Sequence, residues 1–160
     1  MIDAYGRTID YLRVSITDRC NLRCLYCMPA GGVTPISHHK VMRYEEILRL
    51  IAVMAGLGVK KLKITGGEPL VRKGAVGFIA AAKQLPGIEQ VTLTTNGQLL
   101  ENALPALIAA GIDGINFSLD TLDAAAYADV TRGGSLDKVL SGLDAAYAAG
   151  VRPLKINSVL

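Results

Sequence analysis

Short segments in which apolar and polar residues alternate recur along the chain, separated by longer segments with apolar residues at helical spacing. Alternation with a period of two is typical of strands, and apolar residues three or four positions apart are typical of helices that bury one face. This regular succession predicts an α/β fold with a parallel sheet of right-handed βαβ units. The predicted strands are 11–17, 61–65, 90–95, 114–119 and 152–159, and the predicted helices are 44–57, 73–84, 100–110 and 136–149.

The alternation also sorts the strand residues onto two faces of the predicted sheet. One face is apolar and should pack against the helices. The other is polar, although parallel sheets and barrel interiors are commonly filled with Val, Ile and Leu. Buried polar groups without partners cost about 1 to 3 kcal/mol each, so a wet interior or a polar ligand is expected there. The polar positions are Arg13, Ser15, Thr17, Lys63, Thr65, Thr92, Thr94, Asn116, Ser118, Lys155 and Asn157.

Three residues on the polar face are cations from different strands, namely Arg13, Lys63 and Lys155. Almost no acidic residue shares this face, so we expect the cations to face a multivalent anion such as a polyphosphate. An internal carboxylate for each cation is the alternative. The chain has no Gly-x4-Gly-Lys-Ser/Thr loop, which predicts that side chains would hold the phosphate.

Residues suited to binding follow each predicted strand. In a parallel sheet the carboxyl ends of the strands meet at one edge, where α/β folds place their sites. We therefore expect these segments to converge on one site. They are the cysteine-containing segment after the first strand, Gly66-Gly67-Glu68-Pro69, Asn96-Gly97, Asp120-Thr121 and Asn157-Ser158.

All three cysteines of the chain lie in one short segment, as Cys20-x3-Cys24-x2-Cys27. Zinc sites commonly use four ligands, whereas a 4Fe-4S cluster held by three cysteines keeps one iron open to a substrate or cofactor. Closely spaced cysteines in odd number argue against disulfides. A zinc site completed by His38 or His39 is the alternative, and would make the chain a binding module without catalysis.

Composition and charge narrow the classes of function. With 160 residues, 51% of them hydrophobic, the chain has the size of one folded domain. A net charge of +3 without a dense Lys/Arg run does not indicate nucleic-acid binding. The longest apolar run, 51–59, is too short for a membrane span, and the first residues lack the apolar part of a secretory signal. The cytoplasm is the expected location.

The cysteine segment and its flanks resemble the radical S-adenosylmethionine (SAM) superfamily, whose signature is Cys-x3-Cys-x-aromatic-Cys, with Tyr26 as the aromatic residue. Within it, the run from Gly6-Arg7 to Met28-Pro29 is similar to the GTP 3′,8-cyclase family, lyases of molybdenum cofactor (molybdopterin) biosynthesis. The similarity runs through essentially the whole chain. Lys155-Ile156-Asn157 also fits that family better than a radical SAM enzyme that modifies peptides.

The resemblance implies a (β/α) partial TIM-type barrel and a set of site residues. Cys20, Cys24 and Cys27 would hold the 4Fe-4S cluster, and SAM would chelate its open iron. The residues matching SAM contacts are Tyr26, Gly66, Gly67, Glu68 and Ser118. Those matching GTP contacts are Arg13, Lys63, Thr94 and Lys155.

The implied reaction is a reductive cleavage of SAM, with an electron from a donor protein. The resulting 5′-deoxyadenosyl radical removes the 3′ hydrogen of GTP, and the product is (8S)-3′,8-cyclo-7,8-dihydroguanosine 5′-triphosphate.

The sequence departs from this family in one respect. Family members carry a second three-cysteine cluster in a carboxy-terminal half, and this sequence has no cysteine after Cys27. We therefore expect an amino-terminal half with a barrel truncated after about five strands, which binds SAM weakly at best and does not complete GTP cyclisation alone. A homodimer is left open.

Overall fold

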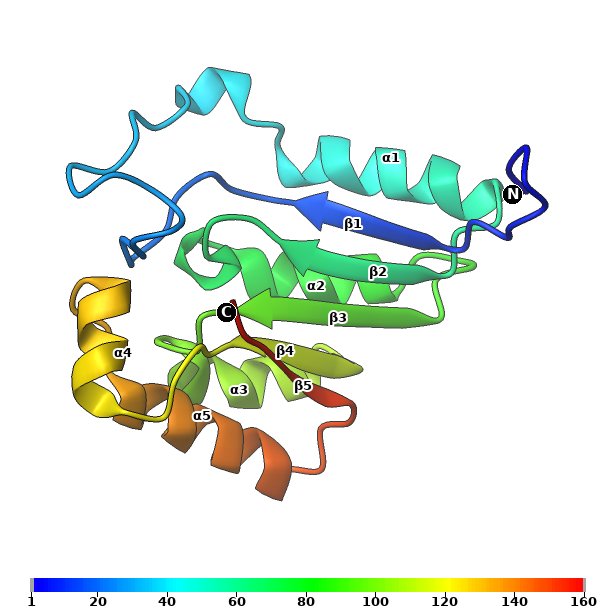
Figure 1. Cartoon of the computed structure of the whole chain (residues 1–160). Coiled ribbons are helices and arrows are strands. Elements are labelled where there is room, and N and C mark those ends of the chain that lie inside the picture. The colour runs from blue at the N-terminus through cyan, green and yellow to red at the C-terminus, as the bar shows by residue number, and fades with distance from the viewer. Residues whose placement is uncertain (1, 160) are drawn as a thin grey trace.

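The structure is a computed structural model and describes residues 2–159. Five parallel strands form one sheet in the order β1-β2-β3-β4-β5, and helices connect them (Figure 1). The predicted α/β class and parallel sheet are confirmed. The strands are β1 (Tyr11–Ser15), β2 (Lys61–Thr65), β3 (Gln90–Thr95), β4 (Gly114–Ser118) and β5 (Leu154–Asn157). The helices are α1 (Tyr44–Gly56), α2 (Ala75–Lys83), α3 (Leu100–Ala109), α4 (Ala124–Thr131) and α5 (Leu136–Ala148), with short 3-10 helices η1 (His38–Lys40) and η2 (Pro69–Val71).

The apolar face of the sheet forms the core, as the strand alternation predicted. Leu62, Ile64, Val91, Leu93, Ile115 and Phe117 are all 0% exposed and belong to one cluster with residues of α1, α2, α3 and α5. Ile156 on β5 differs, because 57% of it is exposed. It lies on a strand at the edge of the sheet, where a single neighbouring strand and its helix leave the apolar side chain partly uncovered.

The strand register aligns the polar face. Arg13 on β1 lies beside Lys63 on β2, which lies beside Thr92 on β3. One step nearer the carboxyl ends of β3 and β4, Thr94 is paired with Asn116, and Asn116 with Lys155. Because paired residues of a parallel sheet project to the same side, the predicted polar positions share one face.

Helix α4 was not predicted from the sequence. Asp123 caps it by accepting a hydrogen bond from Ala126 N–H at 2.7 Å, and it ends at Arg132 in the left-handed conformation, with φ 54°. The helix lies at the carboxyl ends of the strands, at the same end of the sheet as the long segment between β1 and α1 (Figure 1). In residues 2–159, no helix is long and apolar enough to cross a membrane.

Candidate functional site

The three cysteines lie in the connection between β1 and α1, which we call the cysteine loop (residues 16–43). All three are free thiols; Cys20 and Cys24 are half-buried and Cys27 is exposed. A turn joins the last two, because the N–H groups of Cys27 and Met28 both donate to the Cys24 carbonyl, at 2.9 and 3.1 Å. The turn fixes the spacing of Cys24 and Cys27 locally, whereas Cys20 is positioned separately.

Cys20 is held by groups from the sheet edge and from its own loop. Its Sγ accepts from Leu22 N–H at 3.4 Å and from Asn96 Nδ2 at 3.7 Å. Asn96, directly after β3, also donates to the Asn21 side chain at 2.8 Å. The loops after β1 and β3 therefore converge, as predicted for the carboxyl edge of the sheet.

The electrostatics of the cysteines favour a cationic centre. Burial raises the pKa of the Cys20 thiol and, to a smaller extent, so does the Glu68 carboxylate, while the N–H of Leu22 opposes both. Burial also raises the pKa of Cys24, and the charges of Cys20 and Cys27 raise it further. With their pKa values raised, Cys20 and Cys24 need a nearby positive charge to stay deprotonated, which a bound metal centre supplies. This donor set fits an iron-sulfur cluster.

A site for a single metal ion is not present in the described part of the chain, since no three His, Cys, Asp or Glu side chains are gathered for one. A 4Fe-4S cluster binds each cysteine on a different iron, so its thiolates need not converge on one point. His39 is exposed and lines a hollow with Glu46 and Arg49, whereas the hollow beside Cys20 is formed by other residues. The side chain of His38 lies outside the described part of the structure.

The Gly66-Gly67 turn after β2 packs directly against the start of the cysteine loop. Gly67 N–H donates to the Thr17 carbonyl at 2.7 Å, and Glu68 N–H donates to the Arg19 carbonyl at 2.8 Å. A Cβ on Gly67 would lie 2.3 Å from the Arg19 oxygen, and one on Gly66 would lie 2.6 Å from the Thr17 oxygen. Only glycine permits this approach of two backbones, which explains the residue type at both positions.

Glu68 lies inside the protein. It is 0% exposed, and its carboxylate accepts from Leu70 N–H at 3.0 Å, Asn96 N–H at 2.7 Å and the Thr95 hydroxyl at 3.0 Å. Burial raises the pKa of Glu68, and these donors oppose the shift. The carboxylate thus joins the end of β2 to the end of β3. Its predicted contact with SAM stays a prediction.

Tyr26, the aromatic residue between Cys24 and Cys27, donates from its hydroxyl to Asp120 Oδ2 at 2.7 Å. Asp120 follows β4, and its other carboxylate oxygen accepts from Val159 N–H at 2.9 Å. Burial of part of the side chain and the bond to Asp120 raise the pKa of Tyr26. This contact brings the loops after β1, β4 and β5 together.

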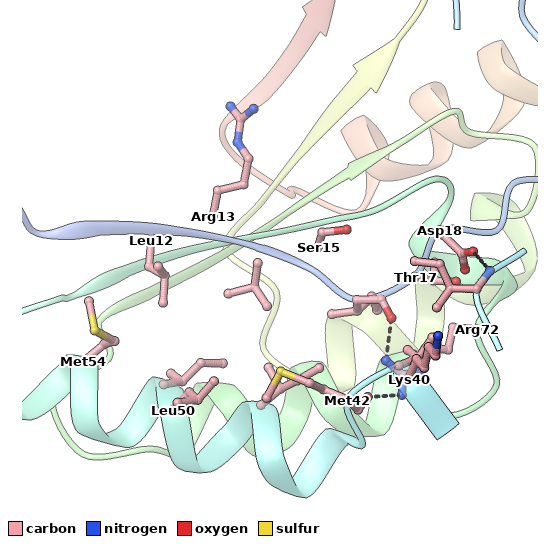
Figure 2. Close-up of a pocket in the computed structure, with 16 residues that line it drawn as sticks. Leu12, Arg13, Ser15, Thr17, Asp18, Lys40, Met42, Leu50, Met54 and Arg72 are labelled. Carbon is pink, nitrogen blue, oxygen red and sulfur yellow. Dashed lines mark hydrogen bonds between the residues drawn. The ribbon is translucent and has the colours of Figure 1, made fainter. Parts of the chain in front are cut away.

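The predicted GTP-contacting residues lie on the polar face of the sheet. Arg13 and Lys155 are exposed, and Lys63 and Thr94 are half-buried. Figure 2 shows Arg13 projecting from β1 on the side opposite α1, while Leu12 faces α1. Within residues 2–159, the carboxylate ion pairs involve other cations, so the alternative of an internal carboxylate for each of these residues finds no support. Ser118, one of the five predicted SAM contacts, ends β4 and is half-buried.

A cavity of about 500 Å³ lies elsewhere, between β1 and α1 (Figure 2). Its walls are mainly apolar, including Leu12, Leu50 and Met54, and no cysteine lines it. A smaller hollow of about 250 Å³ borders Cys20, Arg19 and Met28. The cavity lies mainly on the helix side of the sheet, although Arg13, Ser15 and Thr17 of the polar face also line it.

The sequence did not reveal three parts of this site: helix α4, the Asp120 contact to Tyr26 and the contacts of Arg132. The carbonyls of Val130 and Thr131, at the end of α4, accept from Leu25 and Arg23 N–H at 2.8 and 3.2 Å. Asp120-Thr121 was noted only as a polar segment after a strand. Its partner on the cysteine loop depends on the tertiary fold.

The radical SAM superfamily model matches residues 14–160, and the chain belongs to this superfamily, whose members use a 4Fe-4S cluster and SAM. Over 160 residues the chain is 54% identical to a GTP 3′,8-cyclase of Heliobacterium modesticaldum and 52% identical to one of Petrotoga mobilis. All of this chain is covered, but only 49% and 50% of those proteins, so the chain spans about half the length of these curated relatives.

Solved structures support the fold. Streptococcus suis SuiB bound to S-adenosylmethionine superposes with a TM-score of 0.75 at 21% identity, covering 93% of this chain and 32% of SuiB. HydG, a maturase of the [FeFe]-hydrogenase, gives a TM-score of 0.71 at 19% identity, covering 93% of this chain and 34% of HydG. The predicted radical SAM type of partial barrel is confirmed.

The contacts of Glu68 predict a large effect of Glu68→Gln on stability. The glutamine amide would place an N–H₂ group among donors that now meet a carboxylate, so we expect the free energy of unfolding to fall by about 1 to 3 kcal/mol. Urea denaturation of the metal-free chain measures it. Glu89→Gln is the matched control, because Glu89 forms an exposed ion pair with Lys60 and should matter little. Equal stability of the two variants would contradict this account of Glu68.

Proposed function

We propose that this chain forms the radical SAM centre and the nucleotide-facing sheet surface of a GTP 3′,8-cyclase acting in molybdenum cofactor biosynthesis. The observation that carries the proposal is that Arg13, Lys63, Thr94 and Lys155 share the polar face of the sheet, and that the cysteine loop lies at the carboxyl edge of this sheet. The comparisons support the proposal, because the chain is 54% and 52% identical in sequence to two GTP 3′,8-cyclases over its whole length.

Cys20, Cys24 and Cys27 would hold the 4Fe-4S cluster. When bound with SAM, this group supplies the one-electron cleavage of SAM that yields the radical for removing the 3′ hydrogen of GTP. Gly66 and Gly67 bring their backbone next to the cysteine loop, where no side chain could fit. Tyr26 in the cysteine loop, Glu68 after β2 and Ser118 at the end of β4 complete the proposed SAM-contacting set.

The polar face would bind the substrate. Arg13 and Lys63 lie side by side, and their charges suit a triphosphate, with Lys155 on the far side of Thr94 and Asn116. Asn116 is buried and Thr94 is half-buried. Their amide and hydroxyl groups can each donate or accept a hydrogen bond with a nucleotide bound against the sheet. These residues would orient GTP under the cysteine loop.

An electron donor protein is the other proposed partner. Cys27 and Tyr26 are exposed, so the cysteine loop lies at the surface, where a redox protein could approach the cluster.

The electron paramagnetic resonance spectrum of the anaerobically reconstituted and reduced chain tests the proposed cofactors. We expect a reduced 4Fe-4S signal that changes when SAM is added, because one iron lacks a cysteine. Cys24→Ala should abolish the signal and His39→Ala should leave it intact. A signal indifferent to SAM, or bound zinc in place of iron, would instead favour a metal-binding module without catalysis.

The cations on the polar face predict charge-dependent GTP binding. Lys63→Ala and Lys155→Ala should each weaken the affinity by about tenfold to a hundredfold, since a charge-assisted hydrogen bond contributes about 1.5 to 3 kcal/mol. Titration calorimetry with GTP at two salt concentrations measures the effect. Lys60→Ala is the control, because Lys60 pairs with Glu89 at the opposite end of β2. Unchanged affinity in both polar-face variants would remove these residues from the substrate site.

A further inference from the structure

Arg132, the residue directly after helix α4, contacts the cysteine loop through its side chain. Its Nη1 donates to the carbonyls of Arg23 and Met28, both at 2.8 Å. These two carbonyls bracket the segment that contains Cys24 and Cys27. A single guanidinium group therefore joins the two ends of the turn that carries both cysteines.

The backbone of Arg132 is in a conformation that side-chain-bearing residues rarely adopt. With φ 54° it is the one non-glycine residue of positive φ among residues 2–159. Two glycines follow it directly, and glycine would adopt this conformation with less strain. Arginine is more strained than glycine at this position, but its side chain makes two hydrogen bonds that glycine could not make.

The rest of the connection between β4 and α5 holds the same turn. Leu25 N–H donates to Val130 and Arg23 N–H to Thr131, so the last carbonyls of α4 also face the loop. At the start of the connection, Asp120 accepts from the Tyr26 hydroxyl. The Cys20 thiol is outside this set, because its Sγ accepts from Leu22 and Asn96, and the Arg23 side chain contacts only the Cys20 carbonyl, at 2.9 Å.

We propose that the β4–α5 connection is a scaffold that sets the positions of Cys24 and Cys27 before a cluster binds, and that Arg132 is its positioning residue. The proposal rests on the proposed cluster-binding role of these cysteines. A turn closed only by the bonds of Cys27 and Met28 to the Cys24 carbonyl leaves its two ends free to move. Hydrogen bonds from α4 and Arg132 restrict this motion. The turn is then already ordered when a cluster binds, which lowers the entropic cost of binding.

The test measures the alkylation rate of each cysteine in the folded, metal-free chain, by mass spectrometry of its peptides. Arg132→Gly removes the side chain and suits the backbone conformation, so the variant should fold, as circular dichroism will check. We expect Cys24 and Cys27 to react at least threefold faster than in the parent chain, and Cys20 to change by less than twofold. Arg132→Asn is the second variant, because asparagine tolerates this conformation but is too short to bridge the two carbonyls.

Arg152→Gly is the matched control. Arg152 also donates from Nη1 to two backbone carbonyls, those of Tyr147 and Val151, but it lies before β5, at the opposite end of the parallel sheet from the cysteine loop. Its loss should leave all three rates unchanged. A second readout is the iron that each reconstituted chain retains against a chelator, which should be lower for the two Arg132 variants than for the parent and the control.

The proposal is overturned if the folded Arg132 variants keep the parental rates at Cys24 and Cys27, or if all three cysteines speed up equally, which would show general loosening. Failure of the proposed function is a separate result. It would appear in the parent chain as a cluster that does not respond to SAM, and the thiol rates do not depend on it.

Discussion

The candidate site depends on how the cysteine loop is held against the carboxyl edge of the sheet. The residues around the three cysteines belong to no strand or helix of their own, so other parts of the chain supply their order. The Gly66-Gly67 turn packs against residues 17–19, Asn96 reaches Asn21 and Cys20, and the end of α4 binds the turn that follows. Each of these contacts comes from the end of a different strand or from the segment just after it. The parallel sheet therefore acts as a template that brings distant loops to one place.

Polar groups make this edge specific. Glu68 is a carboxylate buried among N–H and hydroxyl donors, and such a group remains in the interior only when its hydrogen bonds are satisfied. On the face of the sheet, Arg13, Lys63 and Lys155 are left without carboxylate partners in the part of the chain that the structure describes. The same sheet thus combines a hydrogen-bonded polar network at its edge with positive charge that has no carboxylate partner among residues 2–159. That combination suits a bound anion next to a fixed metal centre.

The sequence predicted the sheet and its faces well, because strand alternation depends on burial alone. The bounds of β2 and β3 agree with the prediction, while β1 and β5 are shorter than predicted. Helix α4 was missed because it is short and rich in alanine, so no apolar stripe marks it. The cysteines and the glycine motif were found from their spacing. The direction of the Glu68 side chain, the Tyr26–Asp120 bond and the contacts of Arg132 could not be found, because these partners lie far apart in the chain and meet only in the folded sheet.

The long sequence separation of the Arg132 contacts bears on the order of events during synthesis. Arg132 lies 109 residues after Arg23, and Asp120 lies 94 residues after Tyr26. When the cysteines leave the ribosome, Asp120 and Arg132, which help to position Cys24 and Cys27, have not yet been synthesised. The thiols therefore pass through a period in which they are translated but not yet arranged. Orderly cluster insertion must wait until the fourth strand and the helix after it have left the ribosome and docked.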